Sequence, residues 1–232
     1  MPAYNEEKSL SEVLSGIVES GFQCVVVDDG STDGTSKVAR QFPVELLRLP
    51  VNLGVGGALR LGFKFAVVNG FDAAIQFDAD GQHEHIEINQ LLCKANACGA
   101  DLVVGSRFRS SEIEHEISVS RRIAMRVLAV IATWYTDTSI TDSTSGFRLV
   151  RRPLLDEFAN RLPTHYLGDT FEALVLAGRA RYQILEVPTK MSKREFGSSR
   201  ASPFAAVALM TRAVLAILFR LSHPFTRNPN QS

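Results

Sequence analysis

Short apolar runs alternate with stretches of helical periodicity through the first two thirds of the chain. The apolar runs predict buried strands, over residues 24–27, 43–49, 73–77 and 101–105. Between them, apolar residues recur at spacings of three and four and predict helices, over residues 8–20, 35–41, 55–69 and 85–98. Strands that alternate with helices predict an α/β fold with a mostly parallel, twisted sheet covered on both faces.

The second half of the chain is less regular. The same patterns predict helices over 121–135, 153–161 and 170–178 and a strand over 182–187. A basic stretch at 190–200 then precedes a mostly apolar stretch at 205–221. We expect one domain over residues 1–200 and a C-terminal segment, 201–232, formed by an apolar and basic helix with a polar tail.

Composition matters mainly through the distribution of charge. Hydrophobic residues make up 45% and charged residues 22% of the 232 residues, as in an ordinary globular protein. The net charge is zero, yet residues 187–232 carry seven basic residues against one acidic residue, a net charge of +6 that the rest of the chain balances. This asymmetry favours an anionic partner for the C-terminal segment. The three cysteines form no metal or redox pattern, so we expect them to be reduced in a cytoplasmic protein. We expect no signal peptide and no nucleic-acid partner.

Two carboxylates follow the apolar run at 73–77, in the segment Asp78-Ala79-Asp80-Gly81-Gln82. In extended backbone, side chains two positions apart point the same way, and a turn can bring both onto one cation. Oxygen ligands suit Mg²⁺ or Mn²⁺, and such a cation would neutralise the charge that develops on a diphosphate leaving group. An acidic turn without a ligand is the alternative for this segment taken alone.

A second acidic loop follows the first apolar run. Asp28 and Asp29 precede Gly30, and Asp33 precedes Gly34. A carboxylate here is suited to the ribose hydroxyls or base N–H groups of a nucleotide, and the glycines permit a positive φ and a close approach of the backbone. The alternative is a turn in which Asp33 caps the following helix.

Six motifs occur in a fixed order along the chain: Pro2-Ala3-Tyr4-Asn5-Glu6, Val27-Asp28-Asp29-Gly30-Ser31-Thr32-Asp33-Gly34-Thr35, Asn52-Leu53-Gly54, Asp78-Ala79-Asp80-Gly81-Gln82-His83, Gly105-Ser106-Arg107 and Ser145-Gly146-Phe147-Arg148. Together they resemble the family 2 glycosyltransferases, and within these the dolichol- or polyprenyl-phosphate hexose synthases. The resemblance covers nearly all of residues 2–200. It implies a GT-A fold, meaning a Rossmann-like mixed sheet with helices on both faces. It also implies an inverting transfer from a nucleotide-diphosphate sugar, such as GDP-mannose or UDP-glucose, with Mg²⁺ or Mn²⁺.

The resemblance also implies roles for individual residues on the donor side. It places a nucleotide pocket at Pro2, Tyr4, Glu6 and one of Asp28 and Asp29. It places the metal at Asp80 and Gln82, with Asp78 contacting either the nucleotide or the metal. Arg200 belongs to a loop that in relatives closes over the donor.

The acceptor side is implied to be cationic. The oxygen of a lipid phosphate is already an anion at neutral pH and needs no general base. It needs guanidinium groups, whose geometry matches phosphate, and the candidates are Arg107, Arg121, Arg122 and Arg148. A hydroxyl acceptor is the alternative and would need a base, for which Asp169 and Glu172 are candidates. A nucleotide-sugar-binding protein without activity is a further alternative, against which the complete metal motif argues.

The two ends of the chain carry further expectations. Relatives have an apolar strand directly before the Pro2–Glu6 motif, whereas only Met1 stands there in this sequence, so we expect the sheet to lack a central strand. Either the start of the reading frame is misplaced or the chain is truncated, and we favour a misplaced start. At the other end, residues 205–221 are shorter than the roughly 20 residues of a spanning helix and contain Arg212. We expect them to lie in the membrane interface, on the cytoplasmic face. A buried core helix or a dimer-interface helix, and with it a homo-oligomer, is the alternative.

Overall fold

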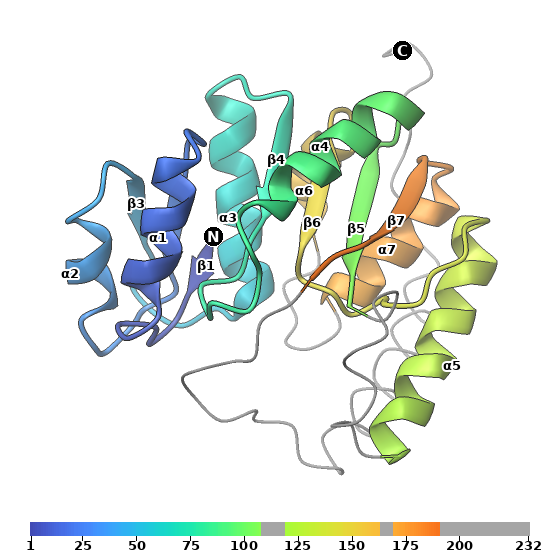
Figure 1. Cartoon of the computed structure of the whole chain (residues 1–232), viewed down its shortest axis with the longest axis horizontal. Coiled ribbons are helices and arrows are strands. Elements are labelled where there is room, and N and C mark those ends of the chain that lie inside the picture. The colour runs from blue at the N-terminus through green and yellow to red at the C-terminus, as the bar shows by residue number, and fades with distance from the viewer. Residues whose placement is uncertain (108–118, 163–168, 191–232) are drawn as a thin grey trace.

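The computed structural model describes residues 1–107, 119–162 and 169–190 (Figure 1). Its strands are β1 (Pro2–Ala3), β2 (Val25–Asp28), β3 (Glu45–Arg48), β4 (Ala73–Gln76), β5 (Leu102–Ser106), β6 (Arg148–Arg151) and β7 (Ile184–Pro188). Its helices are α1 (Leu10–Glu19), α2 (Thr35–Ala39), α3 (Val55–Val68), α4 (Glu87–Cys98), α5 (Val119–Thr136), α6 (Leu154–Arg161) and α7 (Asp169–Arg179).

The strands form two sheets, with the orders β1-β2-β3 and β4-β6-β5-β7. All pairs are parallel except those that β6 makes with β4 and β5. The expected mixed sheet is therefore present, but β6 was not predicted, because it follows directly on the polar loop at 141–147. The strands β1 and β4 are edge strands of their sheets.

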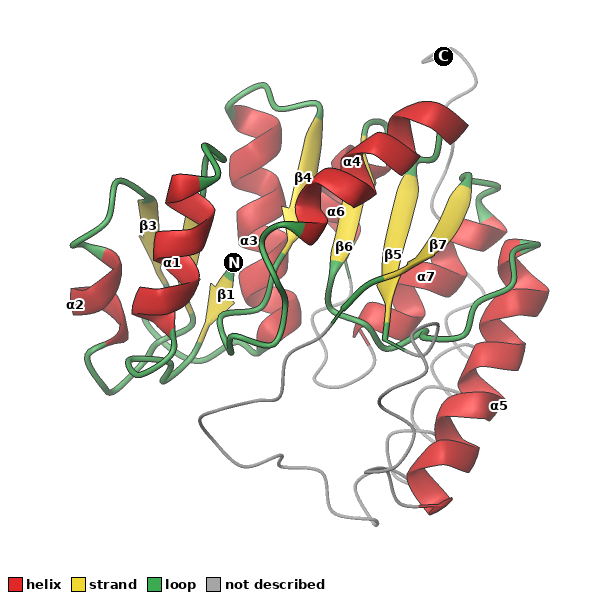
Figure 2. Ribbon diagram, viewed as in Figure 1, coloured by secondary structure: helices red, strands yellow, loops and turns green. Residues whose placement is uncertain are grey.

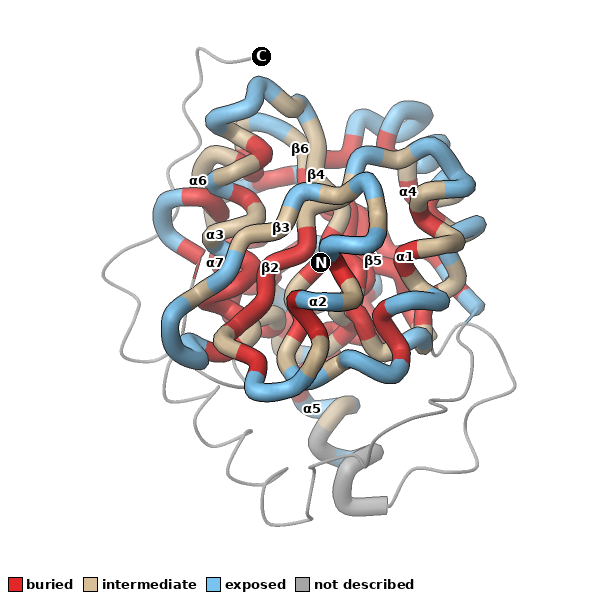
Figure 3. Tube along the Cα trace, turned by 90° about the vertical axis from the view of Figure 1, so that its left-hand side faces the viewer, coloured by how far each residue is buried: buried red, intermediate tan, exposed pale blue. Residues whose placement is uncertain are grey.

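Helices cover both faces of the sheets, as the α/β pattern predicts (Figure 2). One hydrophobic core lies between the strands and α3, α5, α6 and α7, and a second lies between the strands and α1 and α4. Strand β5 serves both cores, because Leu102 and Val104 point into the first and Val103 into the second. Strands β2, β5, β6 and β7 are buried along most of their length, whereas β3 and β4 are mostly half-buried or exposed (Figure 3).

The first strand is two residues long. Pro2 and Ala3 pair with Val27 and Asp28 of β2, and the ladder continues through Met1, whose carbonyl accepts from the Val27 N–H at 2.8 Å. The Met1 amino group extends this pairing by donating to the Val25 carbonyl at 2.9 Å.

The expected C-terminal helix at 205–221 lies outside the described residues. Among the helices that the structure describes, none is long and apolar enough to span a bilayer.

Candidate functional site

The acidic segment after β4 is positioned by two buried neighbours. Phe77 and Ala79 are 4% and 3% exposed and anchor the backbone in the core. Because side chains alternate along extended chain, Asp78 and Asp80 point away from that core. Gly81, at φ +75°, turns the chain directly afterwards, and the Asp80 carboxylate accepts a hydrogen bond from the Gln82 N–H at 3.1 Å.

Asp78 lies against the loop before β6. A Cβ atom at Gly146 would come within 2.4 Å of the Asp78 Oδ2, so a larger residue there would displace this carboxylate. Burial raises the pKa of the Asp78 carboxyl, although the positive charges of the Met1 amino group, Arg107 and Arg148 oppose the increase. The carboxylate is nevertheless open to a ligand, because its side chain remains 34% exposed.

His83 forms the floor beside this carboxylate. Its ring stacks on Phe147 with centroids 5.0 Å apart, meets Phe77 edge-on, and brings Nε2 within 3.9 Å of the Asp78 Oδ2. Burial lowers the pKa of His83 to about 4, so the ring is neutral at physiological pH. The His83 ring beside the two aspartates is therefore uncharged and does not compete with a metal ion for their negative charge.

Whether a divalent cation fits here depends on the donor set. Within the described residues, no group of three His, Cys, Asp or Glu side chains is arranged around one point. Two adjacent carboxylates, one with a raised pKa and both at the surface of the loop, suit Mg²⁺ or Mn²⁺ bound jointly with the oxygens of a diphosphate, which is how such ions are usually held beside phosphates. The residues present thus fit a metal that arrives with its nucleotide.

Arg107 is held at the end of β5 by a buried partner. Its Nε donates to the Asp142 Oδ2 at 2.6 Å and its Nη2 to the Asp142 Oδ1 at 2.9 Å, and Nη2 also donates to the Thr144 Oγ1 at 3.1 Å. Burial by itself would raise the pKa of Asp142, but the hydrogen bonds and charge of Arg107 outweigh it and hold the pKa below its usual range. The guanidinium is therefore fixed in one orientation by an aspartate that is ionised at neutral pH.

A second buried acid supports this pair. The Glu186 carboxylate on β7 is 3% exposed and accepts hydrogen bonds from the Asp142 N–H at 2.7 Å and from the N–H and Oγ1 of Thr141 at 2.9 Å. Sequence analysis missed both Asp142 and Glu186. The available signal was a lone acid inside the apolar strand predicted over 182–187.

Asp28, the last residue of β2, and Asp29, which follows it, are both buried and accept hydrogen bonds from within the protein. Asp28 is fully buried and accepts hydrogen bonds from the Ser31 N–H at 2.8 Å and from the Ser36 hydroxyl. Asp29 accepts from the N–H groups of Leu53 and Gly54 at 2.7 and 2.9 Å, where α3 begins. Burial raises the pKa of Asp29, and these two hydrogen bonds oppose the increase.

The first and second sequence motifs come together around that loop. Asn5 has φ +57°, donates through its N–H to the Ser31 Oγ at 3.0 Å, and accepts from the Thr32 N–H at 2.9 Å. The Glu6 N–H donates to the Thr35 Oγ1 at 2.9 Å. Pro2, Tyr4 and Glu6, all half-buried, are thereby brought to the same end of β2 as Asp28 and Asp29. A nucleotide contact by any of them stays a prediction.

Arg148 lies inside the protein. Its side chain is 2% exposed, and its guanidinium donates to the main-chain carbonyls of Ser143, Ser145 and Thr170 at 2.6–2.8 Å. These contacts tie the loop before β6 to α7. They favour a structural role for Arg148 over direct contact with an acceptor phosphate. Its positive charge also acts on the Asp78 carboxylate.

The remaining expected site residues are described in part or not at all. Arg121 and Arg122 lie near the beginning of α5, and Asp169 begins α7, but their side chains fall outside what the structure describes. Arg200 falls outside the described residues altogether. Glu172 on α7 is 6% exposed, so it is a buried acid and not a surface charge of the helix.

Fold and site together define a class of protein, and comparison with known proteins agrees with it. The chain belongs to glycosyl transferase family 2, whose family model matches residues 1–158. It is accordingly a glycosyltransferase, as the order of motifs predicted.

Two characterised relatives act on lipid phosphates by name. The UDP-N-acetylglucosamine–dolichyl-phosphate N-acetylglucosaminyltransferase of Methanococcus voltae is 29% identical over 220 residues, covering 87% of this chain and 88% of its own. The polyprenol monophosphomannose synthase of Mycolicibacterium smegmatis is 29% identical over 213 residues, covering 87% of this chain and 79% of its own.

Solved structures confirm the expected GT-A fold. The glucosyl-3-phosphoglycerate synthase of Mycobacterium tuberculosis, in complex with Mn²⁺, UDP-glucose and phosphoglyceric acid, superposes with a TM-score of 0.69. The match covers 97% of this chain and 79% of that one at 20% sequence identity.

Proposed function

We propose that this glycosyltransferase moves a hexose from a nucleotide-diphosphate sugar to a polyprenyl phosphate at a membrane surface. One observation carries the proposal: two carboxylates, Asp78 and Asp80, lie close enough to the Arg107 guanidinium for its charge to act on both. The names of the relatives that act on dolichyl and polyprenyl phosphates support the choice of acceptor.

The residues divide the work between donor and acceptor. Asp78 and Asp80 would hold the divalent cation, which supplies charge neutralisation for the departing nucleoside diphosphate. A phosphate acceptor is already ionised, so no side chain has to remove a proton from it. The chain's task on this side is to attract and orient the acceptor, and Arg107 is positioned for it.

Arg107 alone is not sufficient for that task. Asp142 neutralises it across 2.6 Å, so the pair presents little net charge to an incoming phosphate. We therefore assign part of the attraction for the acceptor phosphate to Arg121 and Arg122, near the beginning of α5.

A stripe on α5 supports work at a membrane. Ile123, Val127, Val130 and Trp134 recur at spacings of four, three and four and are 44–76% exposed. The helix contains three arginines and no acid, so its charge favours an anionic lipid surface. Binding to anionic vesicles should fall in Val130→Ser/Trp134→Ser and persist in Val68→Ser, a control on α3 that is 76% exposed. Equal binding by both variants would remove this support.

A transfer assay tests the proposal. The protein is incubated with Mn²⁺, polyprenyl phosphate and, in turn, labelled GDP-mannose and UDP-glucose. Label should enter the lipid fraction and be lost in Asp80→Ala, while Asp72→Ala, an exposed aspartate before β4, keeps full transfer. Metal-dependent nucleotide binding without transfer to any lipid phosphate would refute the choice of acceptor.

A further inference from the structure

Glu186 is a buried acid in the middle of a strand. It lies at the third of the five positions of β7, opposite Val104 of β5, and is 3% exposed. A carboxylate is costly to bury unless its oxygens accept hydrogen bonds. The groups that donate to Glu186 therefore show what this buried charge does.

All the donors to Glu186 that the structure describes come from the beginning of the loop before β6. The Thr141 N–H reaches both carboxylate oxygens at 2.9 Å, the Thr141 hydroxyl donates at 2.9 Å, and the Asp142 N–H donates at 2.7 Å. The Thr141 hydroxyl also lies 2.8 Å from the Ser106 Oγ of β5. Two consecutive residues of the loop are thus attached to two neighbouring strands.

Asp142 transmits this attachment to the guanidinium of Arg107. Its main-chain N–H is held by Glu186, and its carboxylate accepts from the Arg107 Nε at 2.6 Å, Nη2 at 2.9 Å and main-chain N–H at 3.3 Å. A shift of the Asp142 backbone would move the carboxylate and disturb this two-pronged pair, whose strength depends on its geometry. Glu186 therefore controls the orientation of Arg107 without touching it.

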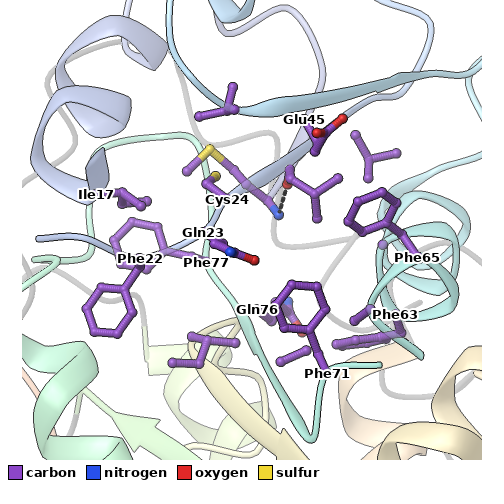
Figure 4. A pocket seen from close by; sticks show the side chains of 18 of the residues that line it. Ile17, Phe22, Gln23, Cys24, Glu45, Phe63, Phe65, Phe71, Gln76 and Phe77 are labelled. Atoms are coloured by element: carbon purple, nitrogen blue, oxygen red, sulfur yellow. Dashed lines mark hydrogen bonds between the residues drawn. The ribbon is translucent and has the colours of Figure 1, made fainter. Parts of the chain in front are cut away.

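A cleft elsewhere in the protein does not offer a phosphate such an anchor. It has a volume of about 930 Å³, lies between β2 and β4, and has mostly apolar walls to which Phe22, Phe63, Phe71 and Phe77 contribute (Figure 4). The described residues that line it include no lysine or arginine. The orientation of Arg107 accordingly matters for a phosphate, and the cleft does not replace it.

We propose that Glu186 is a positioning residue for the acceptor phosphate, on which it acts through Asp142 and Arg107. The inference rests on the acceptor given under the proposed function. The acidic segment at 78–80 is anchored separately, by the buried Phe77 and Ala79. Loss of Glu186 should therefore weaken binding of the acceptor and leave binding of the donor intact.

Steady-state kinetics of transfer to polyprenyl phosphate test this separation. Glu186→Gln turns an amide N–H₂ toward main-chain donors and should raise the acceptor KM roughly tenfold while the donor KM stays within about twofold. Thr141→Val removes only the hydroxyl from the network and should raise the acceptor KM by about two- to threefold. This milder variant keeps the test valid if Glu186→Gln folds poorly.

Asp101→Asn is the matched control for lost stability. Asp101 directly precedes β5, at the end opposite Arg107, is 9% exposed, and accepts from the Gln183 N–H at 2.7 Å. It is also a buried acid that holds the main chain beside β7, but it has no described contact with the loop before β6. Asp101→Asn should lower Tm and leave both KM values unchanged.

The Nε–H signal of Arg107 provides a readout without substrate. In ¹H–¹⁵N spectra this signal is assigned by its loss in Arg107→Gln. Its short hydrogen bond to Asp142 should slow exchange with water, and Glu186→Gln should speed that exchange about tenfold. Asp101→Asn should leave the exchange rate unchanged.

The outcomes separate the inference from the proposed function. If Arg107→Gln raises the acceptor KM and Glu186→Gln does not, or if Asp101→Asn and Glu186→Gln change it equally, Glu186 is structural only and the inference is wrong. An unchanged exchange rate of the Arg107 Nε–H in Glu186→Gln overturns it as well. A wild type that transfers no sugar to polyprenyl phosphate overturns the proposed function, and the exchange rate still decides whether Glu186 positions Arg107.

Discussion

Neutralising Asp142 should destabilise the protein markedly, although the residue lies in a loop. The Asp142 side chain is completely buried and forms a two-pronged ion pair with Arg107 at 2.6 and 2.9 Å. Asp142→Asn keeps the shape of the side chain and removes its charge. Arg107 then remains largely buried, with a partner that accepts through one oxygen only.

The expected loss follows from what buried ion pairs cost when one partner is removed. Such losses are about 3–5 kcal/mol, and the 21% exposure of the Arg107 side chain lets water relieve a part. We therefore expect roughly 2–4 kcal/mol, which for a chain of this size lowers Tm by roughly 5–12 °C. Differential scanning calorimetry or thermal unfolding followed by circular dichroism measures the shift.

The matched control is the pair between Arg181 and Asp137. Its N–O distance is also 2.6 Å, but its side chains are 81% and 74% exposed. Exposed pairs contribute about 0–1 kcal/mol, so Asp137→Asn should change Tm by no more than about 4 °C. Equal shifts in the two variants would refute the reasoning that burial gives the Asp142 pair its weight.

The pH dependence of this contribution has a defined sign. Because the folded pKa of Asp142 lies below the ordinary value of 3.8 for an aspartate, the stabilisation is present above that value and is lost as pH falls through the folded pKa. The difference in unfolding free energy between the wild type and Asp142→Asn should therefore be constant from pH 8 to 5 and shrink below pH 3.8. A difference that instead disappears near pH 6 would assign it to another group.

Three further changes test the loops around the site. Gly146→Ala places a methyl group against the Asp78 carboxylate. It should lower metal-dependent nucleotide affinity at least about tenfold, a loss of roughly 1.4 kcal/mol, as measured by isothermal titration calorimetry. Gly62→Ala on α3, where the added Cβ atom would lie 3.5 Å from its nearest neighbour, should leave this affinity unchanged. Glu186→Gln directs an amide N–H₂ at main-chain donors and should cost about 1–3 kcal/mol in thermal unfolding; an unchanged Tm would show that the loop before β6 does not need it. Asp29→Ala removes two acceptors at the start of α3 and should cost about 0.5–2 kcal/mol, as loss of a helix cap does, and a gain in Tm would contradict that role.

Periodicity predicted most of the fold because most elements bury one continuous apolar face. The strands β2 to β5 and β7, and all the helices among the described residues, lie within a few residues of their predicted positions. Strand β6 (Arg148–Arg151) was not predicted, because it has only two apolar residues, flanked by two arginines. Its burial depends on its neighbours β4 and β5.

The order of the motifs predicted the family, but not the hydrogen bonds and ion pairs within the site. Asp78 and Asp80 are where their sequence context placed them, whereas Arg148 is buried among carbonyl groups. Asp142 and Glu186 carry no local pattern. Their role arises from partners 35 and 45 residues away in sequence, which only the folded chain brings into contact.

The choice of acceptor tests the central claim most directly. The full chain with Mn²⁺ and the labelled donor that it accepts is given either polyprenyl phosphate or the polyprenol of the same length, and label in the lipid fraction is counted. We predict transfer to the phosphate alone, reduced in Arg107→Gln and unaffected in Glu172→Gln. Transfer to the free alcohol, abolished in Glu172→Gln, would contradict the account and identify a hydroxyl acceptor.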